Sequence, residues 1–207
     1  MNPSSPIQSV LFDIGNVIIA FDFRRALVRL EPDCTLKSDA ALAILLPLVP
    51  ELETGRLAVP EFIREASERI GYRGDAAEFQ AAFEDIFTLN EPMVSVVESL
   101  HARGLPLALL SNTNGIHVPF FERTYPVFGH FTGRIYSHEV GVMKPDPRIY
   151  EITIERLGLD PTRTLYIDDL EKNCVAGAEA GFVTHCYDRE RHADLLEYLA
   201  RVDLQAC

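Results

Sequence analysis

The sequence predicts an α/β protein built on a parallel sheet. Five short runs of apolar, β-branched or aromatic residues have the length of strands, at residues 9–12, 106–110, 134–137, 164–167 and 182–186. Helical patterns lie between the later runs, at residues 93–103, 147–157 and 172–180, and each is followed by a glycine, which commonly ends a helix. Strands that alternate with helices of this length form βαβ units. We therefore expect a Rossmann-like core with helices on both faces of its sheet.

One interval breaks this alternation, because residues 22–90 show only helical patterns. Segments 23–30, 38–46, 60–70 and 76–87 carry apolar residues at spacings of three and four, as in Phe79, Ala82, Phe83 and Ile86. Between them, Gly55 is placed to end one helix and Pro60 to begin the next. The sequence thus predicts a core domain of residues 1–21 and 91–207, with residues 22–90 inserted as a small all-helical cap.

Composition limits the partners of the chain. Its 207 residues, 47% of them hydrophobic, are enough to bury a large core. The formal net charge of −12 repels nucleic acids and anionic membrane surfaces, so neither is an expected partner. The four cysteines, Cys34, Cys174, Cys186 and Cys207, show no paired or metal-binding spacing. With no signal peptide, membrane-spanning run or heptad seam, we expect a cytoplasmic monomer.

Polar side chains follow four of the predicted strands. Asp13 ends the first, Ser111 and Asn112 end the second, Lys144 follows the third, and Asp168 with Asp169 ends the fourth. Taken singly, each has an ordinary explanation as a helix cap, a turn residue or a solvated lysine. In an open parallel sheet, however, ligands bind beyond the carboxyl ends of the strands. The coincidence of all four predicts one reactive crevice.

The residue types at this edge suit phosphoryl transfer. Three carboxylates repel each other and a phosphate dianion, by about 4 kcal/mol per pair of unit charges at 4 Å and an effective dielectric of 20. A divalent cation is therefore required, and carboxylate, phosphate and water oxygens suit Mg²⁺, with Mn²⁺ left open. Lys144 and the Ser111 hydroxyl would hold phosphoryl oxygens while Asp13 attacks phosphorus, giving an aspartyl phosphate that water hydrolyses.

Four strings of the sequence resemble the ordered motifs of the haloacid-dehalogenase superfamily: Phe12-Asp13-Ile14-Gly15-Asn16-Val17, Leu110-Ser111-Asn112-Thr113-Asn114, Gly141-Val142-Met143-Lys144-Pro145 and Ile167-Asp168-Asp169-Leu170-Glu171-Lys172-Asn173. The inserted helical block is similar to the small cap of the branch that includes sugar-phosphate phosphatases and the N-terminal phosphatase domain of soluble epoxide hydrolases. The first two strings look most like those of bacterial phosphatases acting on glucose 1-phosphate. The resemblance implies a Mg²⁺-dependent phosphatase whose partner is a small phosphorylated metabolite, such as a sugar phosphate.

The resemblance also implies a role for each matching residue. Asp13 is the nucleophile and a metal ligand. The other implied ligands are the backbone carbonyl of Gly15, Asp169 directly and Asp168 through water, with Asn173 hydrogen-bonded behind them. Ser111, Asn112 and Lys144 are the implied phosphate-binding residues, and Lys144 also pairs with Asp13.

The sequence departs from the family pattern at Gly15, where most of these phosphatases carry a second aspartate as general acid and base. Loss of such a group typically lowers the rate by about 10² to 10⁴. We expect a smaller deficit with acidic leaving groups, such as an anomeric hydroxyl or a nitrophenol. The candidates for a replacement are Asn16, His117, His138, Glu51 and Glu53, and the sequence does not choose among them.

Three alternative functions remain open at this point. A metal-independent 2-haloacid dehalogenase would also use an aspartate nucleophile, but the pair Asp168 and Asp169 would then only oppose its attack. A catalytically silent phosphate-binding domain would explain Gly15, although Asp13 and Lys144 are intact. A sugar-phosphate mutase depends on the residue that Gly15 replaces.

Overall fold

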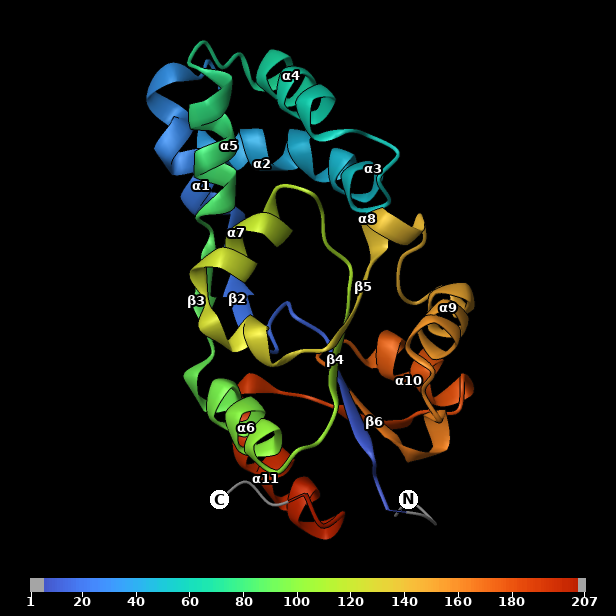
Figure 1. The fold of residues 1–207 in the computed structure, drawn as a ribbon. Coiled ribbons are helices and arrows are strands. Elements are labelled where there is room, and N and C mark those ends of the chain that lie inside the picture. Colours follow the sequence, from blue (N-terminus) through green and yellow to red (C-terminus); the bar gives the residue numbers. More distant parts are fainter. Residues whose placement is uncertain (1–5, 205–207) are drawn as a thin grey trace.

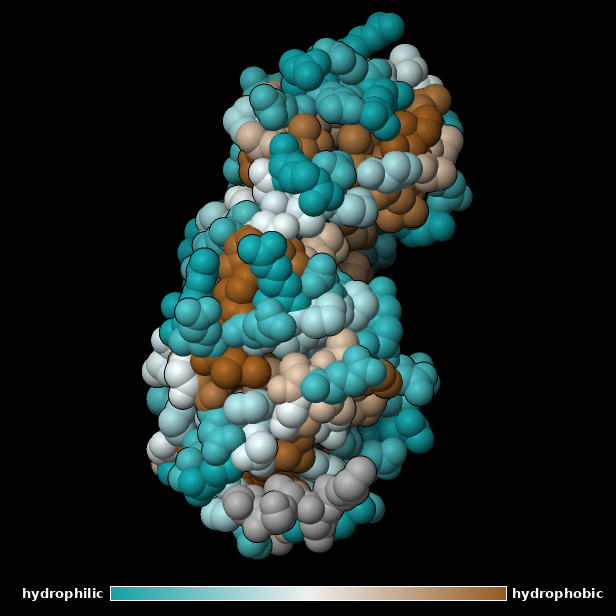
Figure 2. Space-filling model, turned by 90° about the vertical axis from the view of Figure 1, so that its right-hand side faces the viewer, coloured by the Kyte–Doolittle hydropathy of each residue, from teal (hydrophilic) through white to brown (hydrophobic). Residues whose placement is uncertain are grey.

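A computed structural model describes residues 6–204 of the chain (Figure 1). The outermost residues of the predicted core domain, together with Cys207, lie outside the described residues. The cap helices lie at one end of the molecule, and the first and last described residues lie at the other (Figure 1). Seen from the side, the molecule narrows between the cap and the larger core (Figure 2).

The core contains the predicted parallel sheet. Its strands run in the order β5-β4-β1-β6-β7, and every neighbouring pair is parallel. Their bounds are β1 (Ser9–Phe12), β4 (Leu107–Ser111), β5 (Gly133–Tyr136), β6 (Thr164–Asp168) and β7 (Val183–Cys186). Because β1 lies between β4 and β6, its carboxyl end is flanked by the ends of both.

Side chains from alternate positions of β1 enter two different hydrophobic clusters. Val10 and Phe12 pack in the cluster that holds residues of α6 (Glu91–Ala102) and α11 (His192–Arg201). Leu11 packs in the other, with residues of α9 (Pro147–Leu157) and α10 (Glu171–Glu179). Successive strand side chains point to opposite faces, so the expected α/β fold with helices on both faces is confirmed. The core also contains α7 (His117–Thr124) and α8 (Ser137–Val140), which the sequence patterns did not predict.

The inserted segment forms five helices: α1 (Phe23–Leu30), α2 (Ser38–Leu45), α3 (Val49–Glu53), α4 (Val59–Ile70) and α5 (Ala76–Glu84). Their centre is aromatic. The rings of Phe79 and Phe83 stack at 4.8 Å between centroids, and Phe62 packs edge-on against both. Leu52 of α3 and Ile70 of α4 are buried in the same cluster. The cap therefore has an apolar interior that is continuous with the core cluster.

The expectation that residues 22–90 are entirely helical was wrong at their end. The predicted helix 76–87 stops at Glu84, and β3 (Phe87–Leu89) pairs antiparallel with β2 (Ile19–Phe21). The run Ile86-Phe87-Thr88-Leu89 is rich in β-branched and aromatic residues, which favour strands. The ladder extends on both sides, since Asp22 N donates to Ile86 O and Asn90 N donates to Ile18 O. This two-stranded ribbon joins the cap to the core.

Among residues 6–204, no helix combines the length and the apolar character needed to cross a membrane.

Candidate active site

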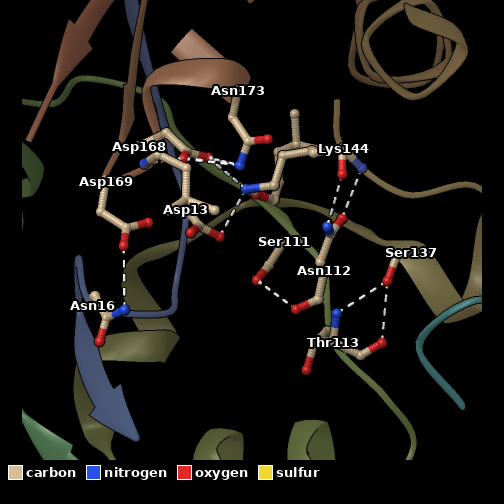
Figure 3. Close-up of polar contacts among 12 residues, drawn as sticks. Asp13, Asn16, Ser111, Asn112, Thr113, Ser137, Lys144, Asp168, Asp169 and Asn173 are labelled. Carbon is tan, nitrogen blue, oxygen red and sulfur yellow. Dashed lines mark hydrogen bonds and ion pairs between the residues drawn. The ribbon is translucent and has the colours of Figure 1, made fainter. Parts of the chain in front are cut away.

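The carboxyl edge of the sheet brings together the side chains predicted to react. Asp13 directly follows β1, Ser111 is the last residue of β4, and Asp168 is the last residue of β6. Lys144 lies on the loop between α8 and α9 and reaches the same edge (Figure 3). The sequence-predicted residues thus lie around one point, as Figure 3 shows.

Lys144 is the centre of this arrangement. Its Nζ lies 2.8 Å from Asp13 Oδ1, 2.6 Å from Asp168 Oδ2 and 2.9 Å from the Leu110 carbonyl oxygen. The side chain is buried. Burial by itself lowers the pKa of the ammonium group, but the charges of Asp13 and Asp168 outweigh it and raise the pKa above its usual value. Lys144 is therefore a fixed positive charge beside Asp13.

Asp168 is held on all sides by donors. In addition to Lys144, it accepts hydrogen bonds from the Tyr166 hydroxyl, from Asn173 Nδ2 and from the Leu170 backbone N–H. Burial raises the pKa of Asp168, yet the ammonium of Lys144 and the hydrogen bonds from Tyr166 and Leu170 lower it overall. Because both carboxylate oxygens are occupied by the protein, contact with a metal through water fits this side chain better than direct ligation.

The three aspartates form an all-oxygen cluster. Carboxylate oxygens of Asp13, Asp168 and Asp169 lie within 4.8 Å of one another. Asp169 Oδ2 accepts a hydrogen bond from Asn16 Nδ2 at 3.1 Å. Burial raises the pKa of Asp13 to about 6; Lys144 opposes this rise, and the charges of Asp168 and Asp169 add to it. A cluster of three carboxylates that a single ammonium group neutralises only in part is chemically suited to a hard divalent cation such as Mg²⁺.

Asn112 has a use that the sequence did not reveal. Its Nδ2 donates to the Lys144 carbonyl at 3.0 Å, and its Oδ1 accepts from the Lys144 backbone N–H at 2.8 Å. The amide therefore fixes the Lys144 segment, while its predicted contact with phosphate stays a prediction. Ser111 lies beside it at the cavity wall. Behind them, Ser137 Oγ accepts from the Thr113 backbone N–H and donates to the Thr113 carbonyl.

The structure gives a physical reason for Gly15. A Cβ atom at this position would lie 3.0 Å from Cε1 of Phe21, closer than ordinary side-chain contacts. The Phe21 ring covers the backbone of Gly15 because no side chain stands there. A side chain at position 15 would require this ring to shift by a few tenths of an ångström.

Two cavities adjoin the reactive edge. The first, of about 270 Å³, is lined by Asp13, Lys144, Asp169 and their neighbours. The second, of about 190 Å³, is largely apolar, and its walls include Phe21, Phe23, Phe87 and Phe121. Gly15, Phe21, Glu53 and Asn112 line both cavities. They therefore form the boundary between the cavity that contains the aspartates and an apolar pocket beside it.

The five candidates for the missing acid–base group now differ. Glu51 is exposed and paired with Arg56 at 2.8 Å. His138 is absent from the walls of both cavities. His117 lines only the apolar cavity, and burial lowers its pKa to about 4, so it is neutral. Asn16 and Glu53 line the polar cavity with Asp13.

Sequence reasoning missed Tyr166 and Phe21. Tyr166 precedes Asp168 by two residues in the same strand, and residues two apart in a strand share a face. That periodicity could have identified Tyr166 as a partner of Asp168. Phe21 carried no such signal, because its contact with Gly15 depends on the short ribbon of β2 and β3.

Comparisons with known proteins agree with the geometry. A family model described as haloacid dehalogenase-like hydrolase matches residues 7–181. D-ribitol-5-phosphate phosphatase of Bacteroides thetaiotaomicron is 27% identical over 198 residues, which cover 91% of this chain and 94% of that protein. A 102-residue segment, 49% of this chain, is 33% identical to mouse acyl-CoA dehydrogenase family member 10 but spans only 9% of that protein.

A solved structure shows the same fold. It is a haloacid-dehalogenase family enzyme from Bacteroides thetaiotaomicron in complex with magnesium and inorganic phosphate. The TM-score is 0.76 at 26% sequence identity, over 88% of this chain and 95% of that one.

A parallel sheet with a helical insert, and an aspartate cluster paired with a buried lysine at the sheet's carboxyl edge, are the fold and the site of a hydrolase. The chain belongs to the haloacid dehalogenase-like hydrolases. Within that family it is a phosphatase, that is, a phosphoric monoester hydrolase.

Proposed function

We propose that this chain is a Mg²⁺-dependent phosphatase of small phosphomonoesters that reacts through an aspartyl phosphate on Asp13. Sugar phosphates such as glucose 1-phosphate are its first candidate substrates. The observation that carries the proposal is the position of Lys144, whose ammonium joins Asp13 and Asp168 beside the oxygen cluster of the three aspartates.

The residues have separate tasks in this reaction. A carboxylate oxygen of Asp13 attacks phosphorus while the bond from phosphorus to the leaving oxygen breaks. Lys144 stabilises the negative charge of the phosphoryl oxygens, and Ser111 with backbone N–H groups holds them in place. Water then attacks the same phosphorus, which releases phosphate and restores Asp13.

The metal has a defined place in the proposal. Asp13, Asp169 and the Gly15 carbonyl would hold Mg²⁺, with Asp168 bound through water and oriented by Asn173. When bound, the cation offsets the repulsion between the carboxylates and the phosphate dianion.

The second cavity supports a small leaving group. Its volume of about 190 Å³ lies below the roughly 300–1,000 Å³ that is usual for drug-sized ligands. A triose, pentitol or hexose fits this size better than a nucleoside does. Aromatic walls suit the apolar faces of a sugar, and a similar protein is named for its action on ribitol 5-phosphate.

The test is metal-dependent release of phosphate from p-nitrophenyl phosphate, glucose 1-phosphate and ribitol 5-phosphate. Wild type, Asp13→Asn and the control Asp39→Asn, an exposed cap residue, are assayed with Mg²⁺ or EDTA. We expect turnover only with the metal, its loss in Asp13→Asn and its retention in the control. Absence of turnover by folded, metal-loaded wild type would favour a silent binding domain, and halide release from 2-haloacids without metal would indicate a dehalogenase.

A further inference from the structure

Glu53 is a carboxyl group without a visible structural task. It is the last residue of α3 and is half-buried. Within residues 6–204 its carboxyl group takes part in no hydrogen bond or ion pair, whereas the Glu51 carboxylate on the same helix accepts two hydrogen bonds from Arg56. Glu53 instead lines both the polar cavity that contains Asp13 and the apolar cavity beside it. A half-buried carboxyl group that has no hydrogen-bond partner among the described residues and lies at such a boundary calls for a functional explanation.

We infer that Glu53, contributed by the cap, is the general acid and base of the phosphatase reaction and replaces the aspartate that Gly15 removes. The inference rests on the proposed function. The scissile oxygen of a phosphomonoester joins the phosphoryl group to the leaving group. A side chain at the boundary of a phosphate site and a leaving-group pocket is placed to exchange a proton with that oxygen.

The cap is seated on the core in a way that fixes α3. A Cβ atom on Gly55 would lie 2.4 Å from the His138 carbonyl oxygen of α8, so only a glycine allows the backbones to approach this closely. The φ of Gly55 is +68°, a conformation that glycine adopts without strain. Thr54 Oγ1 donates to the Pro50 carbonyl at 2.7 Å and closes the end of the helix. Glu53 is thereby held over the sheet edge by its own turn.

Gly15 lacks the carboxyl group that Glu53 supplies to the same two cavities. The position two residues after the nucleophile is covered by the Phe21 ring, and Phe21 and Glu53 line the same two cavities. The acid–base carboxyl is thus supplied by the cap and not by the loop that follows β1.

The environment of Glu53 suits proton transfer near neutral pH. Burial raises its pKa to about 7, the charge of Asp13 adds to the rise, and Lys144 lowers it. Asp169 and Asn16 also face this cavity from the core. A bound cation would offset the effect of Asp13, but burial, the larger cause, would remain. A group titrating near neutrality both donates and accepts protons effectively.

The proton balance closes over one turnover. Protonated Glu53 gives its proton to the leaving oxygen as the phosphorus–oxygen bond breaks and the Asp13–phosphorus bond forms. Ionised Glu53 then takes a proton from the water that attacks phosphorus, and the Asp13–phosphorus bond breaks. The products are an alcohol and inorganic phosphate, and both carboxyl groups return to their initial states.

The test compares Glu53→Gln with Glu51→Gln, a carboxyl two residues away on the same helix. Rates are measured for p-nitrophenyl phosphate and for the alkyl phosphate that wild type hydrolyses fastest. We expect Glu53→Gln to lower the alkyl phosphate rate by about 10² to 10⁴. With p-nitrophenyl phosphate it should release one nitrophenolate per enzyme in a burst and then turn over slowly, because the second step lacks its base. Glu51→Gln should behave like wild type, and Glu53→Asp should recover part of the activity.

A second readout separates catalysis from structure. In a single turnover, the rate at which wild type releases the alcohol from the alkyl ester should fall as pH rises through the pKa of Glu53, and this inflection should be missing in Glu53→Gln. Equal rates, an unchanged pH profile and no burst in Glu53→Gln would overturn the inference and leave the phosphatase itself intact. Absence of metal-dependent turnover in wild type and in Glu51→Gln would instead refute the proposed function, and this inference with it.

Discussion

The single ammonium group of Lys144 contacts three oxygen atoms, one each from Asp13, Asp168 and the Leu110 carbonyl. The charge balance of the site depends on this one cation. A buried ion pair gains little over apolar packing, but the loss of one partner leaves an uncompensated charge. Here one cation stands between two carboxylates, so the negative charge of the site exceeds the positive charge. The excess is what a divalent cation would neutralise.

Single residues differ in how well the sequence predicted them. Asp13, Lys144 and the pair Asp168 and Asp169 could be placed together because each follows a recognisable strand, and parallel strands end at one edge. The clamp of Asn112 on the Lys144 backbone joins residues 32 positions apart, and no local pattern records such a contact. Glu53 could only be named among five candidates, because its neighbourhood is set by the packing of cap on core.

The pKa of Glu53 leads to a prediction about stability. A carboxyl whose pKa of about 7 in the folded state exceeds its ordinary value of 4.5 stabilises the fold fully only at low pH. That contribution is lost as pH rises between these two values. Glu53→Gln has no such loss, so the metal-free variant should exceed wild type in unfolding free energy by about 1–3 kcal/mol at pH 8. The two should be equal near pH 4.

Urea unfolding in EDTA at both pH values measures this difference. Glu51→Gln is the control of opposite sign, since its hydrogen bond with Arg56 lowers the pKa of Glu51. Removal of the Glu51 carboxylate should therefore lower the free energy of unfolding slightly at pH 8. A Glu53→Gln variant that is no more stable than wild type at pH 8 would show that Glu53 is not held in an unfavourable environment.

Among the elements, the short ribbon of β2 and β3 shapes the site in a way that the sequence did not predict, whereas the sheet strands and the long helices were predicted. The strands and the long helices follow from periodicity and from glycine stops, and they were predicted within a few residues. The ribbon of β2 and β3 was not, because its residues Ile86 and Phe87 also continue the helical spacing of α5. Their strand conformation depends on pairing with residues 19–21, which are distant in sequence. The same ribbon carries Phe21 over Gly15.

The contact between α3 and α8 yields a prediction with a matched control. Gly55 and Gly158 both have positive φ, +68° and +62°, so alanine strains either turn by about 1 kcal/mol or more. Only at Gly55 would the new Cβ meet another element, the His138 carbonyl; nothing lies within 4 Å at Gly158. Gly55→Ala should therefore lower kcat for alkyl phosphates by about tenfold or more through displacement of Glu53. Gly158→Ala should keep kcat.

Steady-state kinetics and thermal unfolding of both variants decide the matter. Similar losses of stability with a kcat effect confined to Gly55→Ala are the expected result. If kcat is unchanged in Gly55→Ala, the seating of α3 does not position a group that takes part in the reaction.

At the scale of the whole molecule, the feature that matters most for metal binding is the excess of negative charge. The net charge of −12 is spread over the chain, and part of the excess is concentrated at the cluster of Asp13, Asp168 and the half-buried Asp169. The sequence predicted this excess and its chemistry. It could not predict that Lys144, Tyr166, Leu170 and Asn173 would all donate to Asp168 while Asn16 donates to Asp169, because these donors come from separate parts of the chain.

This distribution predicts that Mg²⁺ stabilises the folded chain through one site. A ligand at 100 times its dissociation constant adds about 2.7 kcal/mol to the free energy of unfolding. Wild type should therefore gain several degrees in melting temperature on addition of Mg²⁺, and Asp169→Asn should lose most of that gain. Removal of Mg²⁺ with EDTA should reverse it. An equal gain in wild type and in the variant would mean that the cation acts on the general surface charge.

The central claim is that Asp13 carries the phosphoryl group during turnover. The most direct measurement is acid quenching of the wild-type enzyme at short times after mixing with p-nitrophenyl phosphate and Mg²⁺, followed by mass spectrometry of its peptides. We predict a peptide containing Asp13 that is heavier by one phosphoryl group, absent with EDTA and absent in Asp13→Asn. Rapid turnover with no phosphorylated peptide at any quench time, or with the phosphoryl group on another residue, would contradict the account.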